Sequence, residues 1–172
     1  MKEFIKELYK SLYKEDLIKT ETIYIEKKPP VIEKTNREKL LDFALTFYNV
    51  DPTPKDEVDD EVSCVFSITT ILNKYFKGDF KVIDYTPDLV GQLYLDKRFK
   101  LSNEFKEGNI VIFATKSGNG KVMGHVFMVS KNGKMLSNNS ATGLWQDKYD
   151  IPMMIERYSR YGQLKMSIFE LV

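Results

Sequence analysis

The chain has 172 residues, of which 42% are hydrophobic and 30% charged, and its 26 lysine and arginine residues nearly balance its 25 aspartate and glutamate residues. This length suits one domain with its own core, and the near-zero net charge argues against a dedicated nucleic-acid-binding protein, which usually carries a basic excess. The single cysteine excludes an intramolecular disulfide, and one cysteine with one histidine leaves too few ligands for a structural zinc site. We therefore expect no metal, no cofactor and no nucleic-acid partner.

The first 35 residues are predicted to form a segment of their own, before a domain over residues 36–172. Residues 2–19 place apolar side chains at three- and four-residue spacings among lysines and glutamates, which predicts an amphipathic helix. Residues 20–35 contain Pro29-Pro30, which excludes a helix there and favours an extended strap. The helix either packs on the domain or binds a partner; contact with a membrane or a virion through residues 1–28 is the alternative.

The first half of the domain shows helical patterns. Asn36 is placed to cap a first helix, and an acidic, proline-broken loop follows at 51–61. Gly78 is expected to end a second helix, and Pro87 lies in the first turn of a third. The predicted helices span 37–48, 64–76 and 87–97.

The second half of the domain changes to the alternating pattern of strands. Asn132-Gly133 is a strong hairpin signal between two of them. Strands are predicted at 109–115, 124–130, 134–138 and 164–172, with one more helix at 151–161. Helices followed by strands indicate the α+β class.

The one cysteine and the one histidine are the residues best suited to chemistry. Cys64 lies at the start of a predicted helix, where free backbone amides favour a thiolate. His125 lies near the start of a predicted strand, behind Gly124, a small residue that lets another group approach. An imidazole can take the thiol proton and return it to a leaving amine, so Cys64 and His125 are the candidate catalytic pair.

A third polar group usually holds such an imidazole in the useful tautomer. The partner strand of the hairpin ends beside His125, and Asn138 is our choice from it. Ser137 and Asn139 remain open, because a slip of one residue reverses the faces of a strand.

The same two residues also admit a purely structural reading. A lone cysteine in an apolar helix often serves as a small core residue, and a lone histidine is often a hydrogen-bonded structural residue. The acidic residues Asp59, Asp60 and Glu61 oppose a thiolate, because like charge disfavours it. These acids would then cap the helix or receive a cationic group of a substrate.

Four segments together resemble a family of phage-encoded peptidoglycan hydrolases, which is similar to the NlpC-type and CHAP cysteine peptidases. The pattern is a cysteine that opens a helix, a G-N-I-V strand, a G-H-V strand and then an S-N-N-S-A-T-G segment. The resemblance covers about residues 37–170. The matching segments are Asp60–Leu72 (DEVSCVFSITTIL), Gly108–Phe113 (GNIVIF), Gly124–Val129 (GHVFMV) and Met135–Trp145 (MLSNNSATGLW).

The resemblance implies a compact papain-like fold and a role for each matching residue. Cys64 would be the nucleophile, His125 the general base and acid, and Asn138 the orienting residue, with the backbone amide of Cys64 as an oxyanion donor. The implied substrate is an amide bond of the cell-wall peptide, cleaved through a thioester. Trp145 and Tyr149 would line the cleft or pack in the core.

The implied protein is a phage lysis protein (an endolysin) or a virion-associated protein. The N-terminus lacks the uninterrupted apolar region of a secretory signal peptide, and no apolar run approaches the roughly 20 residues of a membrane span. It would therefore be made in the host cytoplasm and reach the wall through a lysis pore or from a virion.

Two positions depart from the family pattern. Val65-Phe66 follows the cysteine where Ala-Glu is common, and Phe127 stands where many relatives have glycine. Phe127 shares a strand face with His125, so its ring would narrow the cleft or pack against the cysteine helix. Such changes imply altered specificity, or the alternative function of a non-catalytic binding or virion-structural protein on the same scaffold. An acyltransferase is a third reading, because a fold does not fix a substrate.

Overall fold

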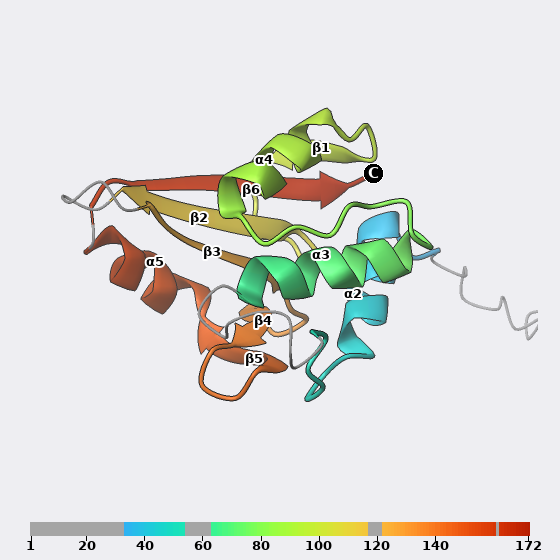
Figure 1. The fold of residues 1–172 in the computed structure, drawn as a ribbon, viewed down its shortest axis with the longest axis horizontal. Helices are drawn as coiled ribbons and strands as arrows, with labels where there is room; N and C mark the ends of the chain where they lie inside the picture. The colour runs from blue at the N-terminus through green and yellow to red at the C-terminus, as the bar shows by residue number, and fades with distance from the viewer. Residues whose placement is uncertain (1–32, 54–62, 117–121, 161) are drawn as a thin grey trace, which may run out of the picture. The chain divides into compact units, whose positions relative to one another are not determined.

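The computed structural model describes residues 33–53, 63–116, 122–160 and 162–172 (Figure 1). The predicted helix at 2–19, most of the strap at 20–35 and most of the loop at 51–61 lie outside these residues. The helices are α2 (Asn36–Leu45), α3 (Ser63–Tyr75), α4 (Thr86–Leu95) and α5 (Ile151–Ser159). The strands are β1 (Phe99–Ser102), β2 (Ile110–Lys116), β3 (Val122–Val129), β4 (Lys134–Asn139), β5 (Leu144–Asp150) and β6 (Leu164–Leu171). None of the helices in the described ranges has the length and apolarity needed to cross a membrane.

The six strands form one antiparallel sheet in the order β1-β6-β2-β3-β4-β5. The predicted α+β class is therefore confirmed, and so is the hairpin between β3 and β4, where Gly133 has a φ of 67°. The two edge strands, β1 and β5, were not predicted. The sequence pattern predicted a sheet of the four inner strands, and β1 and β5 each add one strand at an edge of it.

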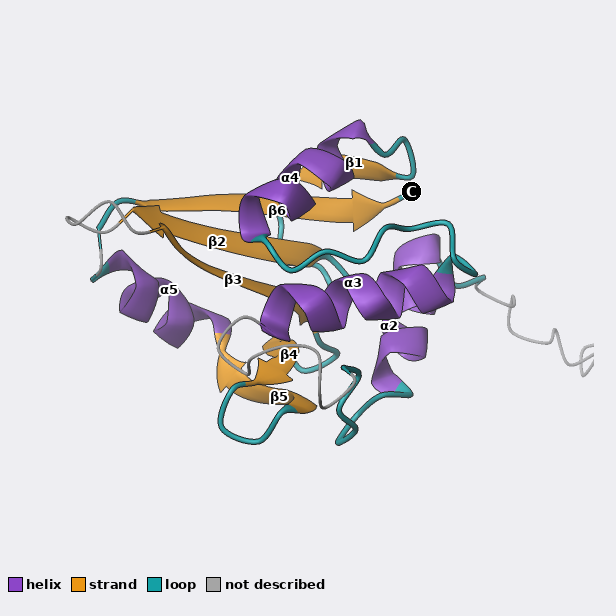
Figure 2. Ribbon diagram, in the orientation of Figure 1, coloured by secondary structure: helices purple, strands orange, loops and turns teal. Residues whose placement is uncertain are grey.

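Helices cover both faces of this sheet (Figure 2). Along β3, Val126 and Met128 face one side and Phe127 and Val129 face the other, as alternation in a strand requires. The side chains of α2, α3 and α4 pack on the first side and form the larger core. The side chains of α5 pack on the second side in a smaller core. Cys64 packs against the larger core.

The start of α2 corrects one prediction. Thr35, not Asn36, is the N-cap residue: its hydroxyl accepts from the amide of Glu38, and the Glu38 carboxylate accepts from the Thr35 amide at 2.8 Å. This reciprocal arrangement is a capping box. Asn36 is the first helical residue, and its side-chain amide donates to the carbonyl of Val172.

The end of α3 is close to the predicted position, but glycine does not act alone there. Lys77 takes the left-handed conformation, with a φ of 54°, and Gly78 follows with a φ of 93°. The amide of Gly78 donates to the carbonyl of Asn73 at 2.8 Å, and the amide of Lys77 donates to the carbonyl of Lys74 at 3.2 Å. These two bonds form a Schellman motif, which satisfies the last carbonyl groups of the helix.

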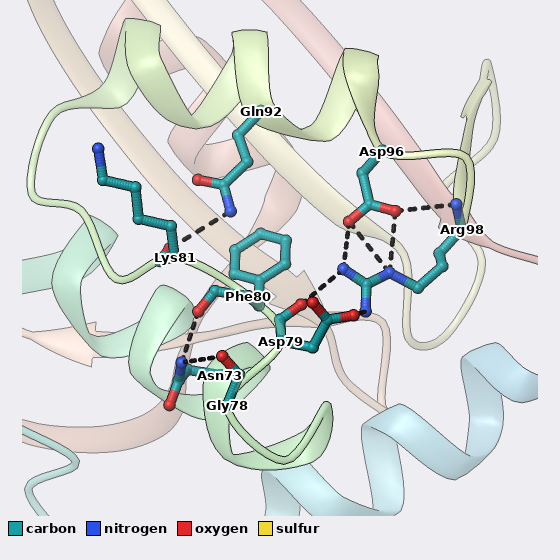
Figure 3. A network of polar contacts seen from close by, with 8 residues as sticks. All are labelled: Asn73, Gly78, Asp79, Phe80, Lys81, Gln92, Asp96 and Arg98. Carbon is teal, nitrogen blue, oxygen red and sulfur yellow. Dashed lines mark hydrogen bonds and ion pairs between the residues drawn. The ribbon is translucent and has the colours of Figure 1, made fainter.

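Arg98 joins the segment between α3 and α4 to the start of β1 (Figure 3). Its guanidinium donates to the carboxylate of Asp96, at 2.6 and 2.9 Å, and to the backbone carbonyl of Asp79 at 2.7 Å. It also lies 4.0 Å from the ring centroid of Phe76. Beside it, Asn73 donates to the carbonyl of Phe80 at 2.5 Å. These contacts hold α4 in position over the sheet.

Candidate active site

The site forms where the pairing between β3 and β4 stops. Of the residues of β3, Met128 and Val129 pair with β4, and the earlier part of β3 pairs with β2 alone. The helix α3 contacts both β3 and β4, so its first residues lie at the point where the two strands diverge (Figure 1). This arrangement places the start of the cysteine helix beside the strand that carries the histidine.

Cys64 is the second residue of α3 and is half-buried. The backbone amides of Val126, Val65 and Cys64 itself donate toward its sulfur, which favours the thiolate, but burial outweighs them and raises the pKa of the thiol. The expected helix-terminal amides are therefore present, whereas the expected depressed pKa is not. At neutral pH the thiol keeps its proton.

His125 lies on the opposite face of β3 from the cysteine helix, on the side covered by α5. Its ring stacks on Tyr158, with centroids 6.0 Å apart and planes inclined by 19°, and lies near Phe127 at 6.4 Å. Burial, and to a smaller degree the charge of Arg157, lower the pKa of His125 to about 4. The imidazole is therefore neutral at pH 7 and able to accept a proton.

Of the three candidate orienting residues, Ser137 lies within hydrogen-bond distance of the imidazole. The Nε2 atom of His125 lies 3.3 Å from its hydroxyl oxygen. Asn138, our choice from the sequence, faces α3 instead and donates from its side-chain amide to the hydroxyl of Ser63. Asn139 donates to the side-chain carbonyl of Gln146 at 2.9 Å. Of the three candidates for the orienting residue, the structure brings Ser137 to the histidine.

Asn138 nevertheless belongs to the site. It is 5% exposed, and its carbonyl oxygen Oδ1 is buried without a hydrogen-bond partner among the described residues. A buried acceptor without a donor is costly and is uncommon in folded proteins. The oxygen is thus available to accept a hydrogen bond from a group that enters the site.

Cys64 and His125 line one cavity of about 120 Å³. Tyr149 also lines it, whereas Trp145 is fully buried in the larger core and Phe127 packs against Phe113 in the smaller core. Phe127 therefore shares the face of His125, as expected, and packs away from the cysteine helix. The complete lining is Ser63, Cys64, Gly124, His125, Asn138, Ser140, Tyr149, Met154, Arg157 and Tyr158.

Two of the residues that line the cavity could not be predicted as site residues from the sequence. Arg157 and Tyr158 belong to the helix predicted at 151–161, whose pattern indicates only an amphipathic element. Gly124 does allow a close approach, as predicted, and the group that approaches is Thr86 of α4: a Cβ at position 124 would lie 2.6 Å from its hydroxyl oxygen. The acids Asp59, Asp60 and Glu61 lie outside the described residues.

Within the described part of the chain, no group of three or more histidine, cysteine, aspartate and glutamate side chains is arranged to hold a metal ion. The chemistry that these residues offer is that of a thiol and an imidazole. Comparison with known proteins adds nothing to this, since no family model, curated protein or solved structure matches the chain.

Proposed function

We propose that this chain is a cysteine amide hydrolase of the papain-like NlpC type that cleaves a peptide bond of peptidoglycan. The observation that carries the proposal is that the only cysteine and the only histidine of the chain, 61 positions apart (125 − 64), line the same cavity. The resemblance of the segments around both residues to phage-encoded peptidoglycan hydrolases supplies the substrate class.

The proposed reaction starts from a neutral Cys64 thiol and a neutral His125 imidazole. We assign Nε2 as the donor to the hydroxyl of Ser137, so that Nδ1 would accept the thiol proton while the sulfur attacks the amide carbonyl carbon. The imidazolium then gives this proton to the leaving amine as the carbon–nitrogen bond breaks, and a thioester remains. Water, deprotonated by the same imidazole, hydrolyses the thioester to a carboxylic acid and restores the thiol.

The backbone amides around the sulfur supply the electrostatic part of catalysis. The amides of Cys64 and Val126 both donate toward the sulfur. When the sulfur attacks a bound amide, the carbonyl oxygen of that amide would lie next to the sulfur and within reach of these donors. Such donors are worth most when they face the charge that develops in the transition state. In the resting protein they face a neutral thiol, so their full effect appears when negative charge forms on the substrate oxygen.

The size of the cavity limits what it holds. Its volume of about 120 Å³ is well below the roughly 300–1,000 Å³ of pockets that enclose a whole small ligand. It therefore accommodates the scissile amide and one neighbouring group, and the rest of a larger substrate remains outside. A polymeric wall peptide, presented from a phage lysis protein or a virion, meets this requirement.

The second candidate function is binding without catalysis on the same scaffold. It is favoured by the raised pKa of the Cys64 thiol, because a protonated, half-buried thiol is also what a structural cysteine shows. On this reading Asn138 and the cavity would bind a wall peptide or a virion component that is not cleaved.

Incubation with purified peptidoglycans, followed by mass spectrometry of the released fragments, separates the two functions. Wild type should release fragments from at least one wall type, whereas Cys64→Ala and His125→Gln, shown to be folded by circular dichroism, should release none. Equal release by wild type and Cys64→Ala would overturn the nucleophile assignment. No release by any folded protein, from diaminopimelate-type and lysine-type walls alike, would favour binding.

A further inference from the structure

Among the described residues that line the cavity of Cys64 and His125, one carries a formal charge, and that charge is positive. Arg157, from the second half of α5, lines the cavity, and the other lining residues include no aspartate, glutamate or lysine. The side chain is exposed, and no ion pair of Arg157 occurs among the described residues. The charge of Arg157 acts on His125, since it is one of the two causes that lower the pKa of the imidazole.

The neighbouring charges on the same helix are arranged differently. Arg160 forms an ion pair with Glu156, four positions earlier, and both side chains lie mostly in solvent. The positive charge of Arg160 is thus compensated on the surface. Arg157 lies between these two residues in sequence but lines the cavity, where the part of the chain that the structure describes places no aspartate or glutamate.

A positive charge beside the general base opposes the reaction as long as it stays uncompensated. When the imidazole takes the thiol proton, two positive charges face one another, which disfavours proton transfer. The titratable groups that line the cavity around His125 are Cys64 from α3, Tyr149 from β5, and Arg157 and Tyr158 from α5. None of them is an acid that would balance the arginine. An anion supplied by the substrate would do so.

We propose that Arg157 is a specificity-determining residue, which binds a carboxylate that the substrate carries next to the scissile amide. Arginine suits this role because its planar guanidinium binds a carboxylate through two parallel hydrogen bonds. The Oδ1 atom of Asn138, which has no partner among the described residues, lies in the wall of the same cavity and would accept a hydrogen bond from an N–H group of the same substrate. The inference rests on the proposed function for the identity of the reaction, but not for the presence of the anion site.

The single cysteine allows the site to be tested without a substrate. Iodoacetate and iodoacetamide both alkylate the thiol with release of iodide; they have nearly the same size and differ in charge. The ratio of their rate constants at Cys64 reports attraction of an anion into the cavity. The ratio is independent of the fraction of thiolate, since both reagents meet the same thiol. Rates are measured by mass spectrometry of the intact protein.

The variants compared are Arg157→Gln, Arg157→Lys and the matched control Arg160→Gln. Removal of the charge at position 157 should lower the ratio of iodoacetate to iodoacetamide rates by roughly two- to fivefold, because the charge of an exposed arginine is partly screened by solvent. Lysine at position 157 should restore most of the ratio, and the control should leave it unchanged. An Arg157→Gln ratio equal to that of wild type would overturn the proposal. So would a thiol that neither reagent reaches, because an anion would then have no access to the cavity.

A second measurement ties the site to the proposed hydrolysis. Wall peptides with free carboxylates are compared with the same peptides after conversion of the carboxylates to primary amides. Wild type should show a lower KM for the free acids, and Arg157→Gln should lose this preference. A normal alkylation ratio without any turnover would leave the anion site standing and reject hydrolysis. Turnover with an unchanged preference in Arg157→Gln would reject the role of Arg157 alone.

Discussion

The Nε2 atom of His125 lies 3.3 Å from the hydroxyl oxygen of Ser137, across the point where β3 and β4 cease to pair. This contact fixes which nitrogen of the imidazole is turned toward the neighbouring strand. In the proposed mechanism Nδ1 is then the base, and the group within hydrogen-bond distance of the ring is a hydroxyl rather than an amide.

Removal of this hydroxyl should therefore disturb the histidine. Ser137→Ala is expected to reduce kcat for wall hydrolysis about tenfold, because the ring loses a hydrogen-bond contact that holds its orientation. The ¹⁵N spectrum of the only histidine gives an independent measurement: wild type should show the tautomer protonated at Nε2, and the variant a mixture. Asn139→Ala, whose native partner is Gln146, is the control. A spectrum unaffected by Ser137→Ala would contradict this assignment.

The lowered pKa of His125 should make the protein less stable in mild acid. The pKa of His125 is about 4 in the folded chain, below its ordinary value of 6.5, so the unfolded chain binds the proton more tightly. This contribution to stability is complete above pH 6.5 and is lost as the pH falls toward 4. We expect the free energy of unfolding to drop by about 2 kcal/mol between pH 7 and pH 5 from this residue alone.

Urea denaturation at both pH values measures this effect, with His125→Gln as the comparison. The variant should lose less stability than wild type over the same interval, since glutamine does not titrate. The carboxylates whose pKa values are lowered, such as Asp96, contribute equally to both proteins and cancel in the difference. Parallel losses in the two proteins would show that the folded state protonates His125 freely.

Gly124 should not tolerate a side chain. A Cβ there would lie 2.6 Å from the hydroxyl oxygen and 2.9 Å from the Cβ of Thr86, so Gly124→Ala is expected to destabilise the fold by about 1–3 kcal/mol. The matched control is Gly91→Ala in α4, the helix that carries Thr86. A Cβ at position 91 meets nothing within 4 Å, and alanine should stabilise the helix by about 0.5–1 kcal/mol. Thermal unfolding of both variants tests the contrast. Two changes of the same sign would argue against close packing at position 124.

Arg98 should contribute more to stability than its partial exposure suggests. Lysine cannot reproduce the fork that contacts Asp96 and Asp79, so Arg98→Lys is expected to cost about 1–2 kcal/mol. The control is Arg160→Lys, whose exposed pair with Glu156 should be worth little. Chemical denaturation distinguishes the two. A cost at position 98 no larger than at position 160 would show that the contacts in Figure 3 are replaceable.

Strong local signals in the sequence predicted most of the described elements. The apolar spacing from Cys64 to Phe76 indicates α3, and Asn132-Gly133 indicates the β3–β4 hairpin. The edge strands carry weaker signals, because β1 has four residues and β5 (LWQDKYD) lacks a continuous apolar face. The cap of α2 had a signal that we misread: Thr35 and Glu38 stand at the spacing of a capping box.

The candidate site was partly predictable for a different reason. Because cysteine and histidine each occur once, composition alone restricts any thiol–imidazole pair to Cys64 and His125. The choice among Ser137, Asn138 and Asn139 depends on which face each residue takes, and the pairing of β4 with β5 has a register shift between Met135 and Ser137 that the local sequence does not indicate. Arg157 belongs to α5, which covers the opposite face of the sheet from the cysteine helix α3. No local sequence pattern relates it to Cys64 or His125, each of which is 30 or more positions away.

The contact between Ser63 and Asn138 joins residues 75 positions apart. Closing so long a loop is entropically costly, and contacts of this kind form late or limit the rate of folding. The cavity can therefore exist only after the hairpin and α3 have come together, so no fragment that ends before β4 contains it. In refolding, the hairpin is expected to gain protection from hydrogen exchange before the amide of Val126 does, and the reactive site would be among the last parts of the molecule to assemble.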